Sequence, residues 1–469
     1  YPTDWAFQAL TSLAERHGCS VANPSGSITR YEAATLLNKC LGNVAQVNEE
    51  ERRLINEFAP ELAVIKGRID GLESRVGEFE AGQFSKTTTL TGKSAFIVGS
   101  VSVDDETSTD SLTMEYSYTL NMNTSFNGSD KLYARIKTGN VRDHFGDKGH
   151  GTYLSAAGAG KGVEADANTD TDTAAGSTPA PTTNSTKYDY VKVDKIWYQF
   201  PVGDNFTVWI GPKIENYYML ASAPSIYKPV LKQFALGGNG PVYGSSTTGG
   251  FGAAWSQQVD DPSAPRLSVS AGYTSKESTN SAQDQGLFGK DADTALLTEV
   301  AYRSPRWGVS LAAAFKENDW EDSYFATNAA KARDADTSET AIGIRAHWRP
   351  EETGIVPNIQ FGFDTTSIEG TTAGEVKEAS GWMAGFGWND VVVDGNKAGI
   401  AIGSRVHGTE LNGGGTDAAE DTFSWEAYYT FKVSDNVSVT PAIFGNQEPS
   451  SGTATDDNSG YVVLTEFRF

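Results

Sequence analysis

The fold is decided by the stretch Leu112–Asn123, which reads LTMEYSYTLNMN. Its even-numbered residues are all apolar or aromatic, and its odd-numbered residues are all polar. Because successive side chains of a β-strand point to opposite faces, this stretch predicts a strand with one apolar and one polar face. It is also long enough for a tilted strand to cross a lipid bilayer.

Fifteen further segments of about ten residues show the same alternation. The resulting prediction is an all-β transmembrane barrel of about sixteen antiparallel strands within residues 88–469. The predicted strands are 91–103, 112–124, 130–142, 188–200, 205–213, 247–257, 266–276, 294–303, 306–316, 338–349, 356–366, 380–389, 397–407, 422–433, 436–446 and 459–469.

The connections between these segments alternate in length. Those after the second, fourth, eighth and fourteenth strands are tight turns, whereas most of those after odd-numbered strands are longer and polar. The longer ones include 104–111, 277–293, 317–337, 367–379, 408–421 and 447–458. Short turns at one end and long loops at the other are typical of outer-membrane barrels, as are aromatic residues near strand ends. A soluble sandwich also alternates, but its inner face favours Val, Ile and Leu.

Composition agrees with this fold and excludes others. The chain has 469 residues and a formal charge of −23, from 37 basic and 60 acidic residues, and its mean hydropathy is −0.39. No window approaches the ~20 consecutive apolar residues of a transmembrane helix. A strongly acidic chain repels phosphates, so no nucleic-acid partner is expected. A barrel tolerates low hydropathy because each strand turns only every second residue to lipid.

Residues 1–43 predict a small helical unit with two helices and a turn between them. Thr29 and Glu32 have the spacing of a capping box at the start of the second helix. Cys19 and Cys40 are the only cysteines of the chain. In an oxidising compartment they predict a disulfide worth roughly 3 kcal/mol; the alternative is a pair of buried thiols.

Residues 44–84 carry apolar residues at alternating spacings of three and four. This heptad pattern predicts a coiled-coil helix, and bulky apolar residues at both seam positions favour a trimer. The alternative is a lone amphipathic helix that packs on the barrel. Pro60 is expected to kink the helix or to start its main segment. The seam consists of Ile55, Phe58, Leu62, Ile65, Ile69, Leu72, Val76 and Phe79.

No catalytic constellation is present in the sequence. The five histidines lack a zinc-ligand spacing, and neither a nucleophile elbow nor a phosphate loop occurs. We therefore predict no enzyme activity, no metal site and no cofactor. The acidic runs near 104–106, 166–172 and 456–457 predict a solvated outer surface, or weak divalent sites that bridge lipopolysaccharide or neighbouring loops.

The connection 214–246 differs from the other loops because it is rich in apolar and aromatic residues. Such a loop is expected to fold back into the barrel and to form a constriction. Basic residues there would favour small anions and neutral solutes; the alternative is that they merely solvate the pore wall. The predicted constriction residues are Lys213, Tyr217, Tyr218, Tyr227, Lys228 and Lys232 from the loop region, and Arg135, Lys137, Arg345 and Arg405 from the wall, with Glu115, Glu299 and Glu426 as counter-charges.

The N-terminal unit resembles one S-layer homology (SLH) motif. The resemblance rests on Asp4 and Trp5, and on the signature formed by Thr29, Arg30 and Glu32. It implies a periplasmic unit that binds a peptidoglycan-linked polysaccharide, with Arg30 as the contact for an anionic glycan group. The alternative is that Arg30 and Glu32 only pair and cap a helix.

The order of modules along the whole chain resembles the cyanobacterial outer-membrane porins. These are grouped with the carbohydrate-selective porins and are sometimes labelled iron-uptake porins. The resemblance implies a homotrimer in the outer membrane, with lipid and lipopolysaccharide around the barrel and the N-terminal region in the periplasm. The main hypothesis is passive diffusion of small hydrophilic solutes and inorganic ions, combined with tethering to peptidoglycan. The alternatives are a tether or adhesin with a plugged barrel, and a specific sugar or iron channel.

Overall fold

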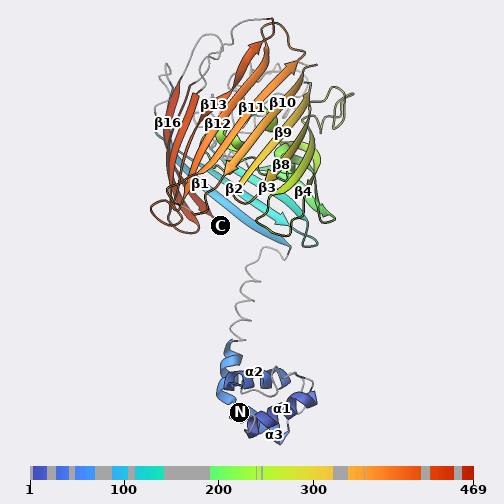
Figure 1. Cartoon of the computed structure of the whole chain (residues 1–469), viewed down its shortest axis with the longest axis vertical. Coiled ribbons are helices and arrows are strands. Elements are labelled where there is room, and N and C mark those ends of the chain that lie inside the picture. The colour runs from blue at the N-terminus through green and yellow to red at the C-terminus, as the bar shows by residue number, and fades with distance from the viewer. Residues whose placement is uncertain are drawn as a thin grey trace, which may run out of the picture. The chain divides into compact units, whose positions relative to one another are not determined.

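The chain forms two compact units, Tyr1–Lys86 and Thr87–Phe469, which are described separately. Figure 1 shows a computed structural model of the chain. The residues that the structure describes are 4–17, 19, 28–41, 48–68, 87–103, 111–141, 191–238, 240–244, 247–318, 320, 336–352, 354–413, 423–447 and 457–469.

The N-terminal unit contains three helices, α1 (Trp5–His17), α2 (Arg30–Leu41) and α3 (Glu49–Glu57). The predicted capping box at the start of α2 is present: the Glu32 carboxylate accepts the Thr29 N–H at 2.7 Å, and the Thr29 hydroxyl accepts the Glu32 N–H at 3.2 Å. Leu10, Leu13 and Leu37 are fully buried in the core between the helices. Among the described residues, no helix is long and apolar enough to span a bilayer.

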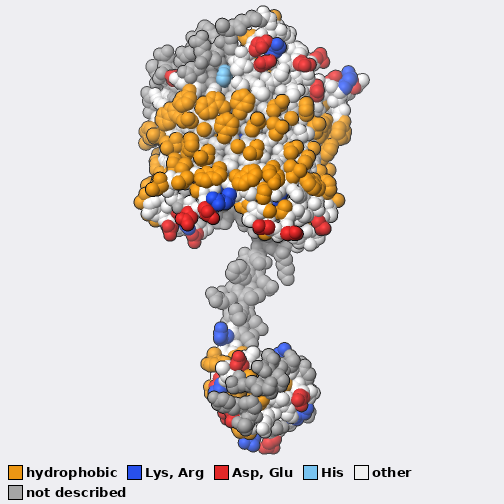
Figure 2. Space-filling model, in the orientation of Figure 1, with side chains coloured by type: hydrophobic (Ala, Val, Ile, Leu, Met, Phe, Trp, Pro, Cys, Tyr) orange, Lys and Arg blue, Asp and Glu red, His pale blue; other side chains and the backbone are white. Residues whose placement is uncertain are grey.

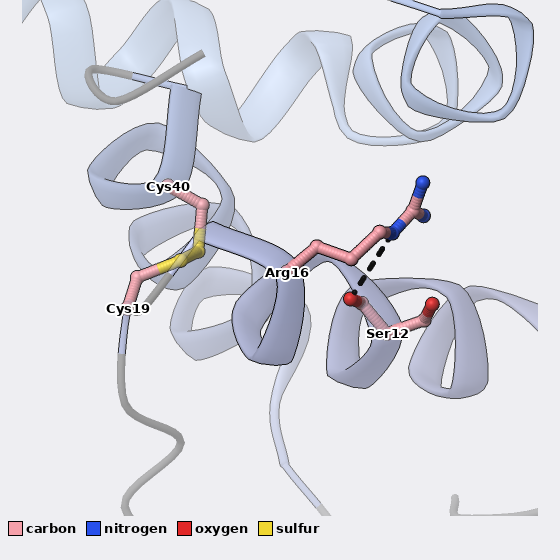
Figure 3. The surroundings of a disulfide bond; sticks show 4 residues. All are labelled: Ser12, Arg16, Cys19 and Cys40. Carbon is pink, nitrogen blue, oxygen red and sulfur yellow. Dashed lines mark hydrogen bonds between the residues drawn. A yellow bond between two sulfur atoms is a disulfide. The ribbon is translucent and has the colours of Figure 1, made fainter.

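Cys19 and Cys40 form a disulfide in this core, with their Cα atoms 5.5 Å apart. The bond joins the segment after α1 to the end of α2, close to the last turn of α1, where the Arg16 Nε donates to the Ser12 carbonyl (Figure 3). Because a unit of this size buries little apolar surface, the bridge adds stability by restricting the unfolded chain.

The first residues of the predicted coiled-coil seam contact the helical unit itself. Phe58 is buried in its core, and Leu62 and Ile65 pack against the same cluster. The chain turns at Phe58, and the helix resumes over residues 59–68, with Pro60 in its first turn. The rest of the predicted coiled coil, residues 69–84, lies outside the described residues.

The second unit is a closed barrel in which sixteen antiparallel strands pair in sequence order and β1 pairs with β16. The predicted number of strands is therefore confirmed. The strands are β1 (Thr88–Val103), β2 (Thr113–Thr124), β3 (Lys131–Gly139), β4 (Lys192–Val202), β5 (Phe206–Glu215), β6 (Thr247–Ser256), β7 (Arg266–Ser275), β8 (Thr294–Arg303), β9 (Trp307–Glu317), β10 (Ser338–Trp348), β11 (Asn358–Glu369), β12 (Val376–Asn389), β13 (Lys397–Leu411), β14 (Phe423–Lys432), β15 (Val437–Asn446) and β16 (Asn458–Arg468).

The two faces of the wall differ as the alternation predicts. Figure 2 shows a broad band of apolar side chains around the visible face of the barrel, with charged side chains above and below it. Exposed residues such as Phe96, Val300 and Trp382 belong to the outer face. Large apolar side chains exposed in such a continuous band are stable in lipid but not in water.

The loop predicted over 367–379 is much shorter in the structure. β11 continues to Glu369 and β12 begins at Val376, which leaves a connection of 370–375. The extended strand ends bury a small apolar cluster of their own, in which Ile368 packs with Val376 and Val406. The sequence signal for a loop was misleading because these apolar residues are few and are separated by polar ones.

Candidate functional site

The connection between β5 and β6 lies inside the barrel. It contains three short 3-10 helices, η1 (Asn216–Met219), η2 (Lys232–Gly237) and η3 (Pro241–Tyr243). Residues 216–244, which we call the inner loop, bury Met219, Leu231 and Val242 completely. The inner loop thus covers its apolar side chains with the barrel wall, as its composition predicted.

The first part of the inner loop is attached to β7 and β8. The Ala221 N–H donates to the Ser270 hydroxyl at 2.9 Å, and the Arg303 guanidinium donates to the Ala221 carbonyl at 3.2 Å. Met219 packs against the inner wall beside Trp209 and Trp197. These contacts fix the point at which the chain leaves the wall and enters the lumen.

Arg345 on β10 holds the middle of the inner loop. Its guanidinium forms an ion pair with Asp364 on β11 at 2.6 Å, and its Nε donates to the Leu236 carbonyl at 2.7 Å. The same guanidinium lies 4.8 Å from the centre of the Tyr243 ring, an arrangement that favours a cation–π interaction. The Tyr243 hydroxyl in turn donates to Glu299 on β8 at 3.3 Å.

Gly362 on β11 allows the inner loop to approach this part of the wall. A Cβ atom at this position would collide with the carbonyl oxygen of Gly237 in η2. Any larger residue would therefore push the inner loop away from β11.

Glu426 on β14 holds the tip of the inner loop. Its carboxylate accepts the Tyr227 hydroxyl at 2.8 Å, the Val230 N–H at 3.0 Å and the Leu231 N–H at 2.6 Å. Its exposed fraction is 1%. Around it, Val230, Leu231 and Phe234 pack against inward-facing apolar side chains of β1, β12, β13, β15 and β16.

A charged cluster lines β3 and β4 beside η1. Arg135 pairs with Asp194 and its Nη1 donates to the Tyr218 hydroxyl at 3.4 Å, and Lys195 pairs with Glu215. Lys137 lies 3.9 Å from Asp194. The alternation that points to Arg135 and Lys137 applies equally to Lys195, which the prediction missed. Asp194 joins this face because the pairing of β3 and β4 has a bulge between Arg135 and Ile136.

The predicted constriction residues therefore do not form one basic ring. Tyr217 and Tyr218 stack edge to face at 5.1 Å beside the charged cluster, and Tyr227 lies at Glu426. Arg405 is buried on β13. Glu115 is buried on β2, and the side chain of Lys232 lies outside the described residues. Arg135 and Arg345 are neutralised by carboxylates, so they do not act as unpaired positive charges.

Lys213 does not face the lumen, and its assignment to the constriction was wrong. A bulge in β5, between Gly211 and Ile214, shifts the alternation by one residue. Lys213 consequently pairs with Ile196. Ile196 precedes Trp197, whose side chain faces the lumen, so the side chains of Ile196 and Lys213 face outward. Its Nζ donates to the Val193 carbonyl at 3.3 Å on the exposed outer side.

In the N-terminal unit, the predicted glycan-binding residues make contacts within the unit itself. The Arg30 guanidinium pairs with Glu57 and Glu61 at 2.9 and 2.6 Å, and its hydrogen bond to the Glu61 carboxylate lowers the pKa of that carboxyl. Asp4 caps α1 through its carbonyl, which accepts the Phe7 N–H at 3.0 Å. Trp5 is exposed and stacks under the Arg53 guanidinium at 4.8 Å.

Metal-binding geometry is lacking in the part of the chain that the structure describes. There, no group of three or more His, Cys, Asp or Glu side chains is placed to hold a metal ion.

Comparisons with solved structures place this fold among porins. OprB of Pseudomonas putida superposes with a TM-score of 0.52 over 82% of this chain and 94% of its own, at 11% identity. OmpF of Salmonella typhi, solved with daunomycin, superposes with a TM-score of 0.50 over 81% of this chain and 97% of its own, at 13% identity. These identities are low, so the similarity is one of fold.

Sequence comparisons extend over the whole chain. An uncharacterized protein of Nostoc sp. is 28% identical over 100% of this chain and 84% of its own length. An uncharacterized protein of Synechocystis sp. is 25% identical over 100% of this chain and 89% of its own. The family model of the carbohydrate-selective porins matches residues 49–469, which include all sixteen strands. The chain therefore belongs to the OprB family of carbohydrate-selective porins.

Proposed function

We propose that the barrel is a passive outer-membrane channel for small hydrophilic solutes and inorganic ions. The observation that carries this proposal is the inner loop, which is held at several points to the inner face of a closed barrel. A sixteen-stranded barrel encloses a lumen wide enough for water, and a loop inside it narrows the passage. We propose the inner loop and the charged cluster on β3 and β4 as the constriction.

The test is electrical recording from the purified full-length protein in planar bilayers, with liposome swelling in uncharged solutes. A diffusive channel gives stepwise currents that rise linearly with salt, and swelling rates that fall with solute size. A barrel that serves only as a tether or adhesin gives negligible conductance and no swelling. A specific sugar or iron channel gives currents that its ligand blocks at saturating concentration.

One observation supports passage of sugars. Tyr133, Trp197 and Tyr218 lie in ring contact beside the charged cluster, with ring centres 5.0 and 6.3 Å apart. Aromatic faces next to hydrogen-bonding charges suit sugar rings, which have an apolar face and a polar edge. Saturable block of the ion current by a neutral sugar, weakened in Tyr218→Ala, would support a sugar-specific channel over general diffusion.

We further propose that the N-terminal unit is periplasmic and tethers the outer membrane to peptidoglycan-linked polysaccharide. The SLH-like residues support this role, and exposed Trp5 offers an aromatic surface for a sugar ring. The full-length protein is expected to sediment with isolated cell-wall sacculi, and Trp5→Ala to reduce the bound fraction. Tyr31→Ala, which removes another exposed aromatic ring, is the matched control.

We also propose that the protein is a homotrimer, which the heptad seam supports. Leu72→Asp combined with Val76→Asp would place charges at two seam positions and is expected to convert a trimer to monomers. Light scattering in detergent measures the mass, and Glu73→Gln, which lies between the seam positions, is the control. A mass that stays trimeric in the double variant would show that the barrel alone holds the trimer together. The outer surface of the barrel that is not covered by another subunit would contact lipid and lipopolysaccharide.

A further inference from the structure

A cavity of about 690 Å³ lies inside the barrel between the tip of the inner loop and the wall. Its described lining includes inward-facing residues of β1, β2, β14, β15 and β16, and residues 228–230 of the inner loop. It also includes Gly395 and residues 434–436, which belong to short turns. The cavity therefore lies at the short-turn end of the lumen, which is the periplasmic end in the proposed channel.

The lining of this cavity is basic, although the chain as a whole is strongly acidic. Its described charged residues are five cations and two anions, which leaves an excess of three positive charges. The cations are Lys93, Lys228, Lys397, Lys432 and Arg468, and the anions are Asp435 and Glu466.

Both anions of the cavity are already paired. Glu466 forms ion pairs with Lys93 and Arg468, and Asp435 pairs with Lys432 at 2.6 Å. Lys228 and Lys397, by contrast, are exposed, and within the described residues neither has a carboxylate partner. Two of the three excess charges therefore sit on one lysine of the inner loop and one lysine of β13, and the third belongs to the group in which Lys93 and Arg468 share Glu466.

Hydroxyl groups accompany these lysines. Tyr428, Ser438 and Thr440 line the same cavity from β14 and β15. A lysine ammonium supplies a compact positive charge with three donors, and hydroxyl groups supply further donors that can turn toward an acceptor. This combination suits a small tetrahedral oxyanion better than a halide, because an oxyanion presents several acceptors at once.

We propose that this cavity is a binding site for a small oxyanion of the size of phosphate, with Lys228 and Lys397 as its charged contacts. The inference rests on the proposed channel for its physiological role: the site would concentrate anions at the periplasmic mouth and make the channel prefer anions to cations. The ion selectivity of the channel then comes from this cavity, and not from Arg135 and Arg345, which are paired with carboxylates.

The first experiment measures phosphate binding to the detergent-solubilised full-length protein by isothermal titration calorimetry, and so does not depend on conductance. Wild type is expected to bind inorganic phosphate, and Lys228→Gln combined with Lys397→Gln to weaken binding at least tenfold. Lys213→Gln is the matched control, because it removes an exposed lysine from the outer face. Equal phosphate binding by wild type and the double variant, or none by either, would overturn the site.

The second experiment measures the chloride-to-potassium permeability ratio from reversal potentials in a salt gradient, with and without phosphate at constant ionic strength. If each of the two lysine charges lies about 8 Å from a permeating ion, with water between them and screening at 0.1 M salt, the double variant is expected to lower the chloride-to-potassium permeability ratio two- to fivefold. Lys213→Gln is expected to leave this ratio unchanged. Phosphate is expected to reduce the chloride current of wild type from one side only. An absence of current in wild type refutes the channel but leaves the calorimetric result standing. A ratio unchanged in a conducting double variant refutes the selectivity role alone.

Discussion

Glu426 connects the tip of the inner loop to β14. Its buried carboxylate accepts three hydrogen bonds from the loop tip. Two of the donors are backbone N–H groups, which cannot rotate toward another acceptor as a side-chain donor can. Replacing Glu426 with Ala leaves all three donors facing an apolar pocket formed by Val230, Leu231 and their neighbours. We therefore predict that Glu426→Ala releases the tip while the barrel stays folded.

The size of the effect follows from the number of unpaired donors. An unsatisfied buried donor costs about 1–3 kcal/mol. Three such donors act on the same segment, so their costs do not add fully, and about 3 kcal/mol is a conservative value. At 1.36 kcal/mol for each factor of ten, this shifts the ratio of detached to attached tips by roughly a hundredfold. Tyr227→Phe removes one donor together with its bond, so it is expected to shift the ratio by less than tenfold.

Single-channel recording resolves these states. A detached tip widens the lumen and moves during the recording, so Glu426→Ala is expected to raise the mean conductance and the current noise. Glu426→Gln keeps one acceptor oxygen and is expected to fall between wild type and Glu426→Ala. Glu410→Gln is the matched control, since Glu410 belongs to an exposed ion pair with Lys377.

Two outcomes would refute the reasoning. One is a Glu426→Ala channel with the conductance and noise of wild type, in a protein whose barrel resists heat and detergent normally. The other is a change of equal size in Glu410→Gln, which would show that any lost carboxylate alters the current. Crosslinking Val230→Cys to Ala442→Cys, residues of one apolar cluster, should restore quiet currents if detachment is the cause.

Three further predictions concern other contacts. Arg345→Met leaves the buried Asp364 carboxylate without its ion-pair partner, so the barrel is expected to lose about 3–5 kcal/mol of stability. Thermal unfolding in detergent measures this loss. The double variant Arg345→Met with Asp364→Leu should recover most of the lost stability. Gly362→Ala is expected to displace the inner loop and to increase current noise, at a cost of about 1–3 kcal/mol. Arg30 lowers the pKa of Glu61, so this pair stabilises the N-terminal unit above about pH 4.3 and loses that contribution as pH falls through the lowered pKa. Melting of the helical circular dichroism signal should therefore occur at lower temperature at pH 3 than at pH 7, with a smaller difference in Arg30→Gln.

The barrel wall could be predicted from the sequence because lipid imposes a simple rule on it. Each strand must turn every second side chain to the bilayer, so the alternation identifies both the strand and its inner face. The rule placed Arg135, Glu299 and Glu426 on the inner face, where the structure has them. Lys213 was assigned to the lumen as a neighbour of the inner loop, and that assignment was wrong because a single extra residue in β5 turns its side chain to the outer face; a bulge leaves little trace in an alternating pattern.

The structural role of each charged residue on the inner face of the barrel could not be predicted from the alternation. Arg345 and Glu426 look alike in the sequence to Lys397, since each is a charged residue on the inner face of a strand. Their environments differ because the inner loop, distant in sequence, is hydrogen-bonded to Arg345 and Glu426, whereas Lys397 is exposed in the cavity. Burial makes a partner obligatory for the first two, because an unpaired buried charge costs several kcal/mol. Lys397 is exposed, so no such requirement holds for it, and its charge is available to the oxyanion that we propose. This difference in burial separates the charges that hold the inner loop from those of the proposed anion site.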